Sequence, residues 1–141
     1  MPRRRLSGRS TSDIKSAVFN IREIAFTCYP VLDMARARGF YEAVLGLRPT
    51  LTHGEAGGMQ WTEYAIGAGT LSLGCGAPGW KPRADGCSIA LEMEDFEAAM
   101  AHLRARGIKF RMEPCTTPVC RMAFIEDTEG NTICIHQRKS K

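Results

Sequence analysis

The stretch IAFTCYPVLDMARARGFYEAVLGL, residues Ile24–Leu47, decides the fold class because its pattern changes from strand to helix. Residues 22–29 are expected to form a strand. Asp33 is expected to cap the next element, since its carboxylate can accept hydrogen bonds from the free N–H groups of a first helical turn. Residues 34–45 have apolar side chains at helical spacing, and Gly46 can adopt the left-handed conformation that ends a helix. The stretch therefore predicts a β-strand followed by an amphipathic α-helix.

The rest of the chain predicts three further strands and then a repeat of the same order. Glycine clusters separate short β-type runs at residues 48–53, 59–66 and 70–75. After a segment rich in Pro and Gly, the second half follows. Its predicted strands are 87–93, 109–113, 119–126 and 131–137, and its predicted helix, capped by Glu94 or Asp95, is 96–106. The similar spacing of the two halves indicates an internal duplication.

This duplication predicts an α+β fold of two tandem βαβββ modules, residues 21–76 and 86–138. Two such modules side by side would form a curved mixed sheet, with the helices on its outer face and a concave cleft on the other. Residues 1–20 would be a basic, flexible N-terminal extension. The segment 76–85 would link the modules, which could pair within one chain or swap between chains.

The positive charge of the chain sits at its two ends. The formal net charge is +4, and residues 1–20 hold five basic residues against one acidic residue. Residues 138–141 add three basic residues, whereas residues 21–137 have 11 basic and 14 acidic residues. A nucleic-acid interface needs a basic face on the fold itself, and no apolar run reaches the roughly 18–20 residues of a membrane span. The composition therefore predicts neither nucleic acid nor membrane as a partner.

The six cysteines indicate a reducing compartment. No two of them have C-x-x-C spacing, and the chain begins without the apolar region of a secretory signal. Reduced thiols and a cytoplasmic location are therefore expected. A structural zinc on Cys115, Cys120 and His136 is the alternative to small buried thiols.

Three motifs in this order resemble the vicinal-oxygen-chelate superfamily of glyoxalases, bleomycin-resistance proteins and extradiol dioxygenases. The first is Ile24–Leu47, and the second is IALEMEDFEAAMAHLRARGIKF, Ile89–Phe110. The third, FIEDTEGNTICIHQRK at Phe124–Lys139, resembles the closing DPxGN hairpin, with Thr128 in place of the proline. The resemblance covers residues 21–138. It implies the fold described above, a small-molecule site in the cleft and a homodimer.

The resemblance also places four metal-ligand positions on cleft-facing strands. Metal-dependent members have His or Glu there, whereas this chain has Phe26, Ser72, Ser88 and Cys134. A hard divalent metal requires carboxylate or imidazole ligands, so no metal and no other cofactor are expected. Without a metal, glyoxalase isomerisation and extradiol cleavage would lack the ion that polarises the substrate.

Other polar side chains are candidates for cleft chemistry. Glu63, beside Trp61, could be a general base or an exposed strand residue. Glu92 and His136 could form an acid/base pair or a structural hydrogen bond. Arg121 could anchor an anionic ligand or be a solvated strand residue.

Aromatic and sulfur side chains are further candidates. Phe26, Trp61, Tyr64 and Trp80 could form flat walls for a planar ligand or pack in the core. Cys134 and Cys120 could be nucleophiles if a base lies nearby. We therefore expect a metal-independent protein that binds a planar or aromatic compound in its cleft and sequesters it. The alternative is a lyase, isomerase or dioxygenase-like enzyme that uses Glu63 or His136.

Overall fold

The structure, a computed structural model, describes residues 19–140. The expected N-terminal extension therefore lies almost wholly outside the described residues. The first half contains β1 (Thr27–Pro30), α1 (Met34–Arg38), the π-helix η2 (Gly39–Val44), β2 (Pro49–His53), β3 (Gln60–Ile66) and β4 (Gly69–Cys75). The second half contains β5 (Ile89–Glu92), α2 (Phe96–Ala105), β6 (Phe110–Thr116), β7 (Cys120–Glu126) and β8 (Thr132–Arg138).

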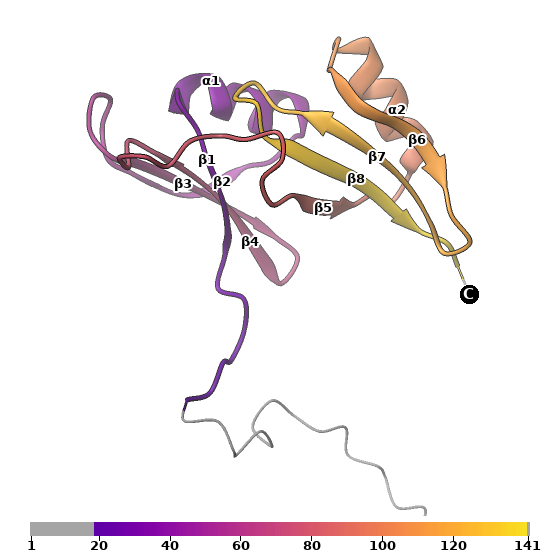
Figure 1. The fold of residues 1–141 in the computed structure, drawn as a ribbon, viewed down its shortest axis with the longest axis horizontal. Coiled ribbons are helices and arrows are strands. Elements are labelled where there is room, and N and C mark those ends of the chain that lie inside the picture. The colour runs from indigo at the N-terminus through magenta and orange to yellow at the C-terminus, as the bar shows by residue number, and fades with distance from the viewer. Residues whose placement is uncertain (1–18, 141) are drawn as a thin grey trace, which may run out of the picture.

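Each half forms its own four-stranded mixed sheet, in the order β1-β4-β3-β2 and β5-β8-β7-β6. The pairs β1/β4 and β5/β8 are parallel, and all other pairs are antiparallel. Within residues 19–140 no strand pairing joins the two sheets. Figure 1 shows the helices of both halves on the same side of the sheets. These features confirm an α+β fold of two tandem βαβββ modules, here called the first module (β1–β4) and the second module (β5–β8).

Both helices begin where the sequence predicts. Oδ1 of Asp33 accepts a hydrogen bond from the Arg36 N–H at 3.0 Å. In the second module, Oδ1 of Asp95 accepts from the Ala98 N–H at 3.0 Å. Each carboxylate thus satisfies an N–H group that has no partner within its own helix. Asp95, and not Glu94, is therefore the cap of α2.

Two boundaries in the first module differ from the sequence prediction. The predicted strand at 22–29 begins only at Thr27, where pairing with β4 starts. The predicted single α-helix at 34–45 widens into η2 after Arg38, because the Leu45 N–H donates to the Phe40 carbonyl, five residues back, at 3.1 Å. Such wide turns occur mostly as short bulges inside α-helices.

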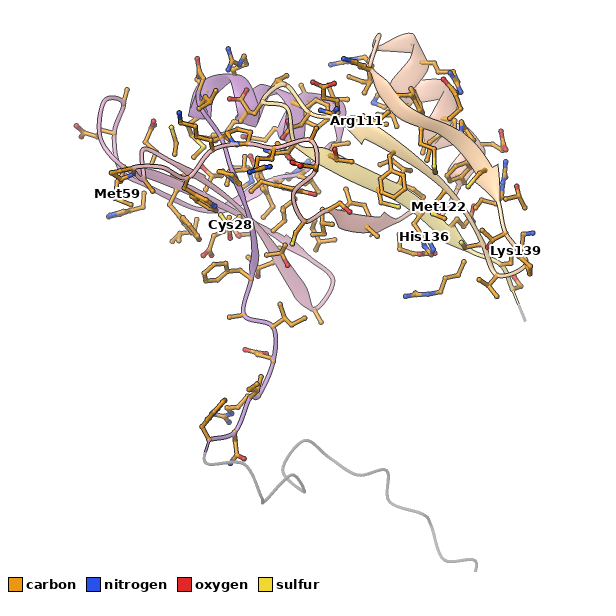
Figure 2. The ribbon with its side chains drawn as sticks, in the orientation of Figure 1. Cys28, Met59, Arg111, Met122, His136 and Lys139 are labelled. Atoms are coloured by element: carbon orange, nitrogen blue, oxygen red, sulfur yellow. The ribbon has the colours of Figure 1, made fainter. Side chains whose placement is uncertain are left out.

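Alternation along the strands divides each sheet into two faces. Leu71, Leu73 and Ile135 point toward the helices and are buried. The opposite face of each sheet is called the open face below. Its members include Cys28 in the first module and His136 in the second, both labelled in Figure 2. The open faces are where the sequence analysis expects a ligand.

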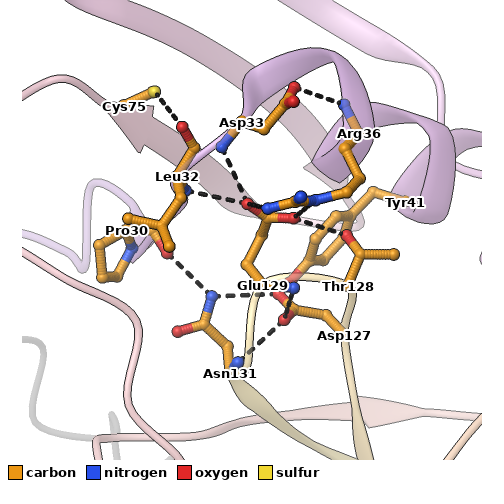
Figure 3. Close-up of polar contacts among 10 residues, drawn as sticks. All are labelled: Pro30, Leu32, Asp33, Arg36, Tyr41, Cys75, Asp127, Thr128, Glu129 and Asn131. Carbon is orange, nitrogen blue, oxygen red and sulfur yellow. Dashed lines mark hydrogen bonds and ion pairs between the residues drawn. The ribbon is translucent and has the colours of Figure 1, made fainter.

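The turn between β7 and β8 joins the second module to the first (Figure 3). The Tyr41 hydroxyl donates to Oδ2 of Asp127 at 2.7 Å, and both residues are buried. Nδ2 of Asn131 donates to Oδ2 of Asp127 and also to the Pro30 carbonyl, at 3.0 and 2.9 Å. A buried carboxylate without such partners would be costly. The turn therefore fixes how the two modules sit against each other.

Glu129, in the same turn, caps the start of α1 from the other module. Its Oε1 accepts hydrogen bonds from the N–H groups of Leu32 and Asp33, both at 2.9 Å. Arg36 forms an ion pair with its Oε2 at 2.7 Å. Burial alone would raise the pKa of the Glu129 carboxyl, but the hydrogen bonds from Arg36 and the backbone together hold that pKa below its usual range.

Tyr29 makes a third connection between the modules. Its hydroxyl donates to the Thr132 carbonyl and accepts from the Ile89 N–H, both at 2.7 Å. Burial raises the pKa of this hydroxyl to about 12, so that it stays protonated and keeps both bonds. The two modules are thus in contact within one chain. In the part of the chain that the structure describes, no helix has the length and apolar character needed to cross a membrane.

Candidate ligand-binding site

Three aromatic side chains gather on the open face of the first module. The Phe26 and Trp61 rings meet edge to face, with their centroids 5.2 Å apart and an angle of 82° between their planes. Trp80, from the segment between the modules, lies directly over Gly74 of β4. A Cβ atom at Gly74 would come within 2.6 Å of the Trp80 ring and 3.3 Å of the Trp61 ring. Glycine at this strand position therefore makes room for both indoles.

Polar groups lie beside these rings. The Trp61 Nε1–H donates to Oε1 of Glu63 at 3.0 Å, so the two side chains lie on the same face of β3. Ser72 lies between Glu63 on β3 and Cys28 on β1 in the strand register, and it is fully buried. Burial and, to a smaller extent, the nearby Glu63 carboxylate raise the pKa of the Cys28 thiol to about 12. Cys28 is thus a protonated, unreactive thiol at neutral pH.

The open face of the second module carries the carboxylate–imidazole pair that the sequence suggests. Nδ1 of His136 lies 2.5 Å from Oε1 of Glu92. Oε2 of Glu92 accepts a hydrogen bond from the Arg138 N–H at 2.7 Å. This backbone bond, followed by the contact with His136, lowers the pKa of Glu92. The imidazole is therefore oriented by an ionised carboxylate, as in acid/base pairs of enzymes, although the same contact also occurs as a structural hydrogen bond.

The remaining predicted residues of the second module are less suited to chemistry. Cys134 is buried, and burial, followed by the proximity of Cys120 and Cys115, raises the pKa of its thiol. A thiol with a raised pKa is a poor nucleophile at neutral pH. Ser88 is exposed and directly precedes β5.

Two residues expected in the cleft lie on the helix side instead. Arg121 stacks on the Phe96 ring, 4.8 Å from its centroid, and forms an ion pair with Glu97 of α2. Arg121 is two residues before the buried Ala123 on β7, and residues two apart in a strand share a face, so both side chains lie on the helix side. Tyr64 is fully buried and stacks on Tyr41. The structure therefore places neither Arg121 nor Tyr64 on the open face, where the cleft was expected.

The predicted site residues form two separate groups. Phe26, Trp61, Glu63 and Ser72 belong to the first module, whereas Ser88, Glu92, Cys134 and His136 belong to the second. Within residues 19–140, no hydrogen bond, ion pair or ring contact joins one group to the other. Sequence reasoning did not include Cys28 and Gly74, although a glycine inside a strand is itself a signal of a close approach.

The family's metal does not fit the residues at its four positions. The Phe26 ring has no donor atom and packs on Trp61, and Ser72 is buried beneath neighbouring side chains. In the described part of the chain, no three His, Cys, Asp or Glu side chains are grouped so that they could hold a metal ion. This also leaves the alternative zinc site at Cys115, Cys120 and His136 without support.

A ligand-sized cavity of about 590 Å³ lies between the modules. Its walls come from the start of β4, from β5, from α2 and from the end of η2, and they are mostly aliphatic. Glu92 is the predicted site residue that borders this cavity. Its volume is in the range of small-molecule pockets, so it is an alternative location for an apolar ligand.

Comparison with known proteins identifies relatives of this fold. The family model "Glyoxalase/Bleomycin resistance protein/Dioxygenase superfamily" matches residues 23–135. TnmS3, an antibiotic binding protein from Streptomyces sp. CB03234, is 27% identical, with a TM-score of 0.70 over 84% of this chain and 98% of that protein. A glyoxalase/bleomycin resistance protein from the same organism is 28% identical, with a TM-score of 0.65 over 82% of this chain and all of that one.

A third solved structure has low sequence identity to this chain, so the similarity is evidence for a shared fold only. The fosfomycin resistance protein FosX from Mesorhizobium loti is 17% identical, with a TM-score of 0.63 over 82% of this chain and 91% of its own. No curated protein matches the chain by sequence.

Proposed function

The chain belongs to the Glyoxalase/Bleomycin resistance protein/Dioxygenase superfamily, and from that premise we propose that it binds a planar aromatic small molecule without a metal ion. The observation that carries the proposal is the gathering of Phe26, Trp61 and Trp80 on the open face of the first module. The similarity to TnmS3, which is an antibiotic binding protein, supports a binding role over a catalytic one.

The chemistry of this face suits recognition of a flat ring. Two indoles side by side offer an extended apolar surface, and aromatic rings stack favourably on such surfaces by about 0.5–1.5 kcal/mol beyond the area they bury. Trp61 is held in place by its bond to Glu63, so little side-chain entropy is lost when a ligand stacks on it. Sequestration of the bound compound follows from affinity alone and requires no catalytic group.

Thermal-shift screening of planar aromatic compounds against the full chain tests the proposal. A ligand that stabilises the protein is then measured by calorimetry with Trp61→Ala, which is expected to weaken binding at least tenfold. Leu32→Ala is the matched control, because Leu32 is an exposed apolar residue between β1 and α1. A ligand whose affinity survives Trp61→Ala but is lost in Leu91→Trp, which narrows the cavity between the modules, would contradict the proposal.

A second candidate function is that of a lyase or isomerase, which the contact between Glu92 and His136 favours. A carboxylate-bound imidazole can remove or deliver a proton through its other ring nitrogen. Incubation of any bound ligand with the protein in D₂O, followed by NMR, would reveal exchange of a ligand proton or formation of a product. Catalysis by this pair requires that the exchange be lost in His136→Gln and reduced in Glu92→Gln. A ligand that stays unchanged would leave binding as the function.

We propose further that the protein works as a homodimer in the cytoplasm. Exposed apolar side chains on both modules, among them Leu51 and Val119, would suit a contact with a second copy. All six cysteines are free thiols, which suits a reducing compartment. Light scattering coupled to size exclusion gives the mass in solution, and a mass of one chain at micromolar concentration would overturn the dimer.

A further inference from the structure

Ser72 presents an unusual buried hydroxyl. The residue is fully buried, and its Oγ has no hydrogen-bond partner among the described residues. Nearly all buried side-chain polar atoms have a partner, because leaving one without costs free energy. A hydroxyl in this state is free to form a hydrogen bond with a bound ligand.

In the register of the sheet, Phe26 and Trp61 lie on opposite sides of Ser72. In the register of the sheet, Ser72 lies directly between Cys28 and Glu63. Phe26 is two residues before Cys28, and Trp61 is two residues before Glu63 on an antiparallel strand. The line between the two rings therefore crosses β4 diagonally at Ser72. Since the ring centroids are 5.2 Å apart, the two side chains together form a cover across this part of the open face.

The Trp61 and Phe26 rings that form this cover are held in place differently. The Trp61 indole is held by its bond to Glu63, and it lies, with the Trp80 ring, next to Gly74. Phe26 precedes the first paired residue of β1, and 47% of its surface is exposed. Moving the Phe26 ring aside breaks no strand pairing, whereas moving the Trp61 ring breaks a hydrogen bond.

We propose that Phe26 is a replaceable cover, and that a planar aromatic ligand takes its place against Trp61 and forms a hydrogen bond with the Ser72 hydroxyl. This inference rests on the function proposed above and names the ligand class. The ligand has a hydrogen-bond donor, a hydroxyl or an amino group, on the edge of its ring system.

The donor requirement follows from the groups around Ser72. Glu63 offers only acceptor oxygens, and one of them already accepts the Trp61 N–H. The Ser72 hydroxyl can donate or accept. A ligand group that can donate a hydrogen bond can therefore bond with both Ser72 and Glu63. A ligand group that can only accept would have the Ser72 hydroxyl as its one partner.

Two matched probes test the inference by calorimetry on the full chain. 2-Naphthol can donate a hydrogen bond, and 2-methoxynaphthalene has the same ring system without the donor. The wild-type protein is expected to bind 2-naphthol about five- to tenfold more tightly, which is the effect of one hydrogen bond. Ser72→Ala is expected to weaken the binding of 2-naphthol at least fivefold, because it removes the hydroxyl with which the ligand forms a hydrogen bond. 2-Aminonaphthalene, tested alongside, distinguishes an amino from a hydroxyl donor by which of the two probes binds more tightly.

Phe26→Ala tests the replaceable cover. The variant is expected to bind both naphthalene probes more tightly than the wild type, because the ligand no longer competes with the Phe26 ring. Ile24→Ala, an exposed apolar residue of the same segment, is the control and should change neither affinity. A weaker or unchanged affinity in Phe26→Ala, or an affinity for 2-naphthol that Ser72→Ala leaves unchanged, would overturn the inference. If neither the wild type nor Phe26→Ala binds any probe, the proposed function itself fails.

Discussion

The Tyr41 hydroxyl and the Asp127 carboxylate, 86 residues apart in sequence, form a buried hydrogen bond of 2.7 Å between the two modules. Tyr41 lies in η2 and Asp127 follows β7, so neither module contains both partners. Burial, reinforced by the Asp127 charge, raises the pKa of the Tyr41 hydroxyl well above its usual value and keeps the donor proton in place.

Tyr41→Phe is expected to lower the free energy of unfolding by about 1.5–3 kcal/mol, since it removes a hydrogen bond to a charged acceptor in a buried position. Urea denaturation followed by circular dichroism measures this change. Tyr64→Phe is the control, because its hydroxyl binds the partly exposed Glu42 within the first module. A loss for Tyr41→Phe no larger than that for Tyr64→Phe would show that the contact between the modules adds nothing to stability.

Glu129→Gln is expected to cost about 2–4 kcal/mol at pH 7, because it removes the charge that α1 and Arg36 bind. The folded-state pKa of Glu129 lies below its usual value. The stabilisation is therefore complete above the usual Glu pKa of about 4.3 and is lost as the pH falls through the lower folded-state pKa. Urea denaturation from pH 7 to pH 3 should show the wild type and the variant converging at acid pH.

Glu113→Gln is the matched control for that experiment. Glu113 forms an ion pair with Arg104 in which both side chains are at least half exposed, and such pairs contribute about 0–1 kcal/mol. A constant difference between the wild type and Glu129→Gln over the whole pH range would contradict the role given to the Glu129 charge.

Ser72→Ala is expected to stabilise the protein without ligand by about 1 kcal/mol. The substitution removes a buried hydroxyl that has no partner among the described residues, together with its desolvation cost. The melting temperature by calorimetry should rise by a few degrees. A fall of similar size would mean that the hydroxyl has a bonding partner in the folded protein.

The thiols are expected to differ strongly in reactivity. Cys87 is the exposed one of the six cysteines, whereas burial raises the pKa of both Cys28 and Cys134. Since the thiolate is the reactive form, a disulfide reagent at pH 8 should modify Cys87 at least a hundredfold faster than either of these. The fast phase should disappear in Cys87→Ser, and its persistence there would assign it to another thiol.

The metal content of the purified protein directly tests whether the side chains at the family's four metal-ligand positions can bind a metal ion. After dialysis against Ni²⁺, Zn²⁺, Mn²⁺ and Fe²⁺, mass spectrometry is expected to find less than about a tenth of an equivalent per chain, because these positions lack imidazole and carboxylate ligands. Near one equivalent, lost in Cys134→Ala or His136→Ala, would show a metal site with other ligands and would place the enzyme hypothesis first.

The sequence by itself determined the order of elements, the duplication and the ends of the helices. Asp33 and Asp95 cap their helices and Gly46 has a φ of 74°, because these features depend on residues within one turn. Alternation also separated Leu71 and Leu73 from Ser72 on β4. The same rule could have placed Arg121 on the helix side, since it shares its face of β7 with the buried residues Ala123 and Ile125.

Tertiary structure alone decided which side chains meet across distant segments. The position of Trp80 over Gly74 and the contact of Phe26 with Trp61 depend on how a linking segment and the unpaired segment before β1 pack on a finished sheet. The bond between Tyr41 and Asp127 depends on how two modules dock. No local pattern encodes such contacts, because their free energy comes from burial and hydrogen bonding between residues that the chain itself does not bring together.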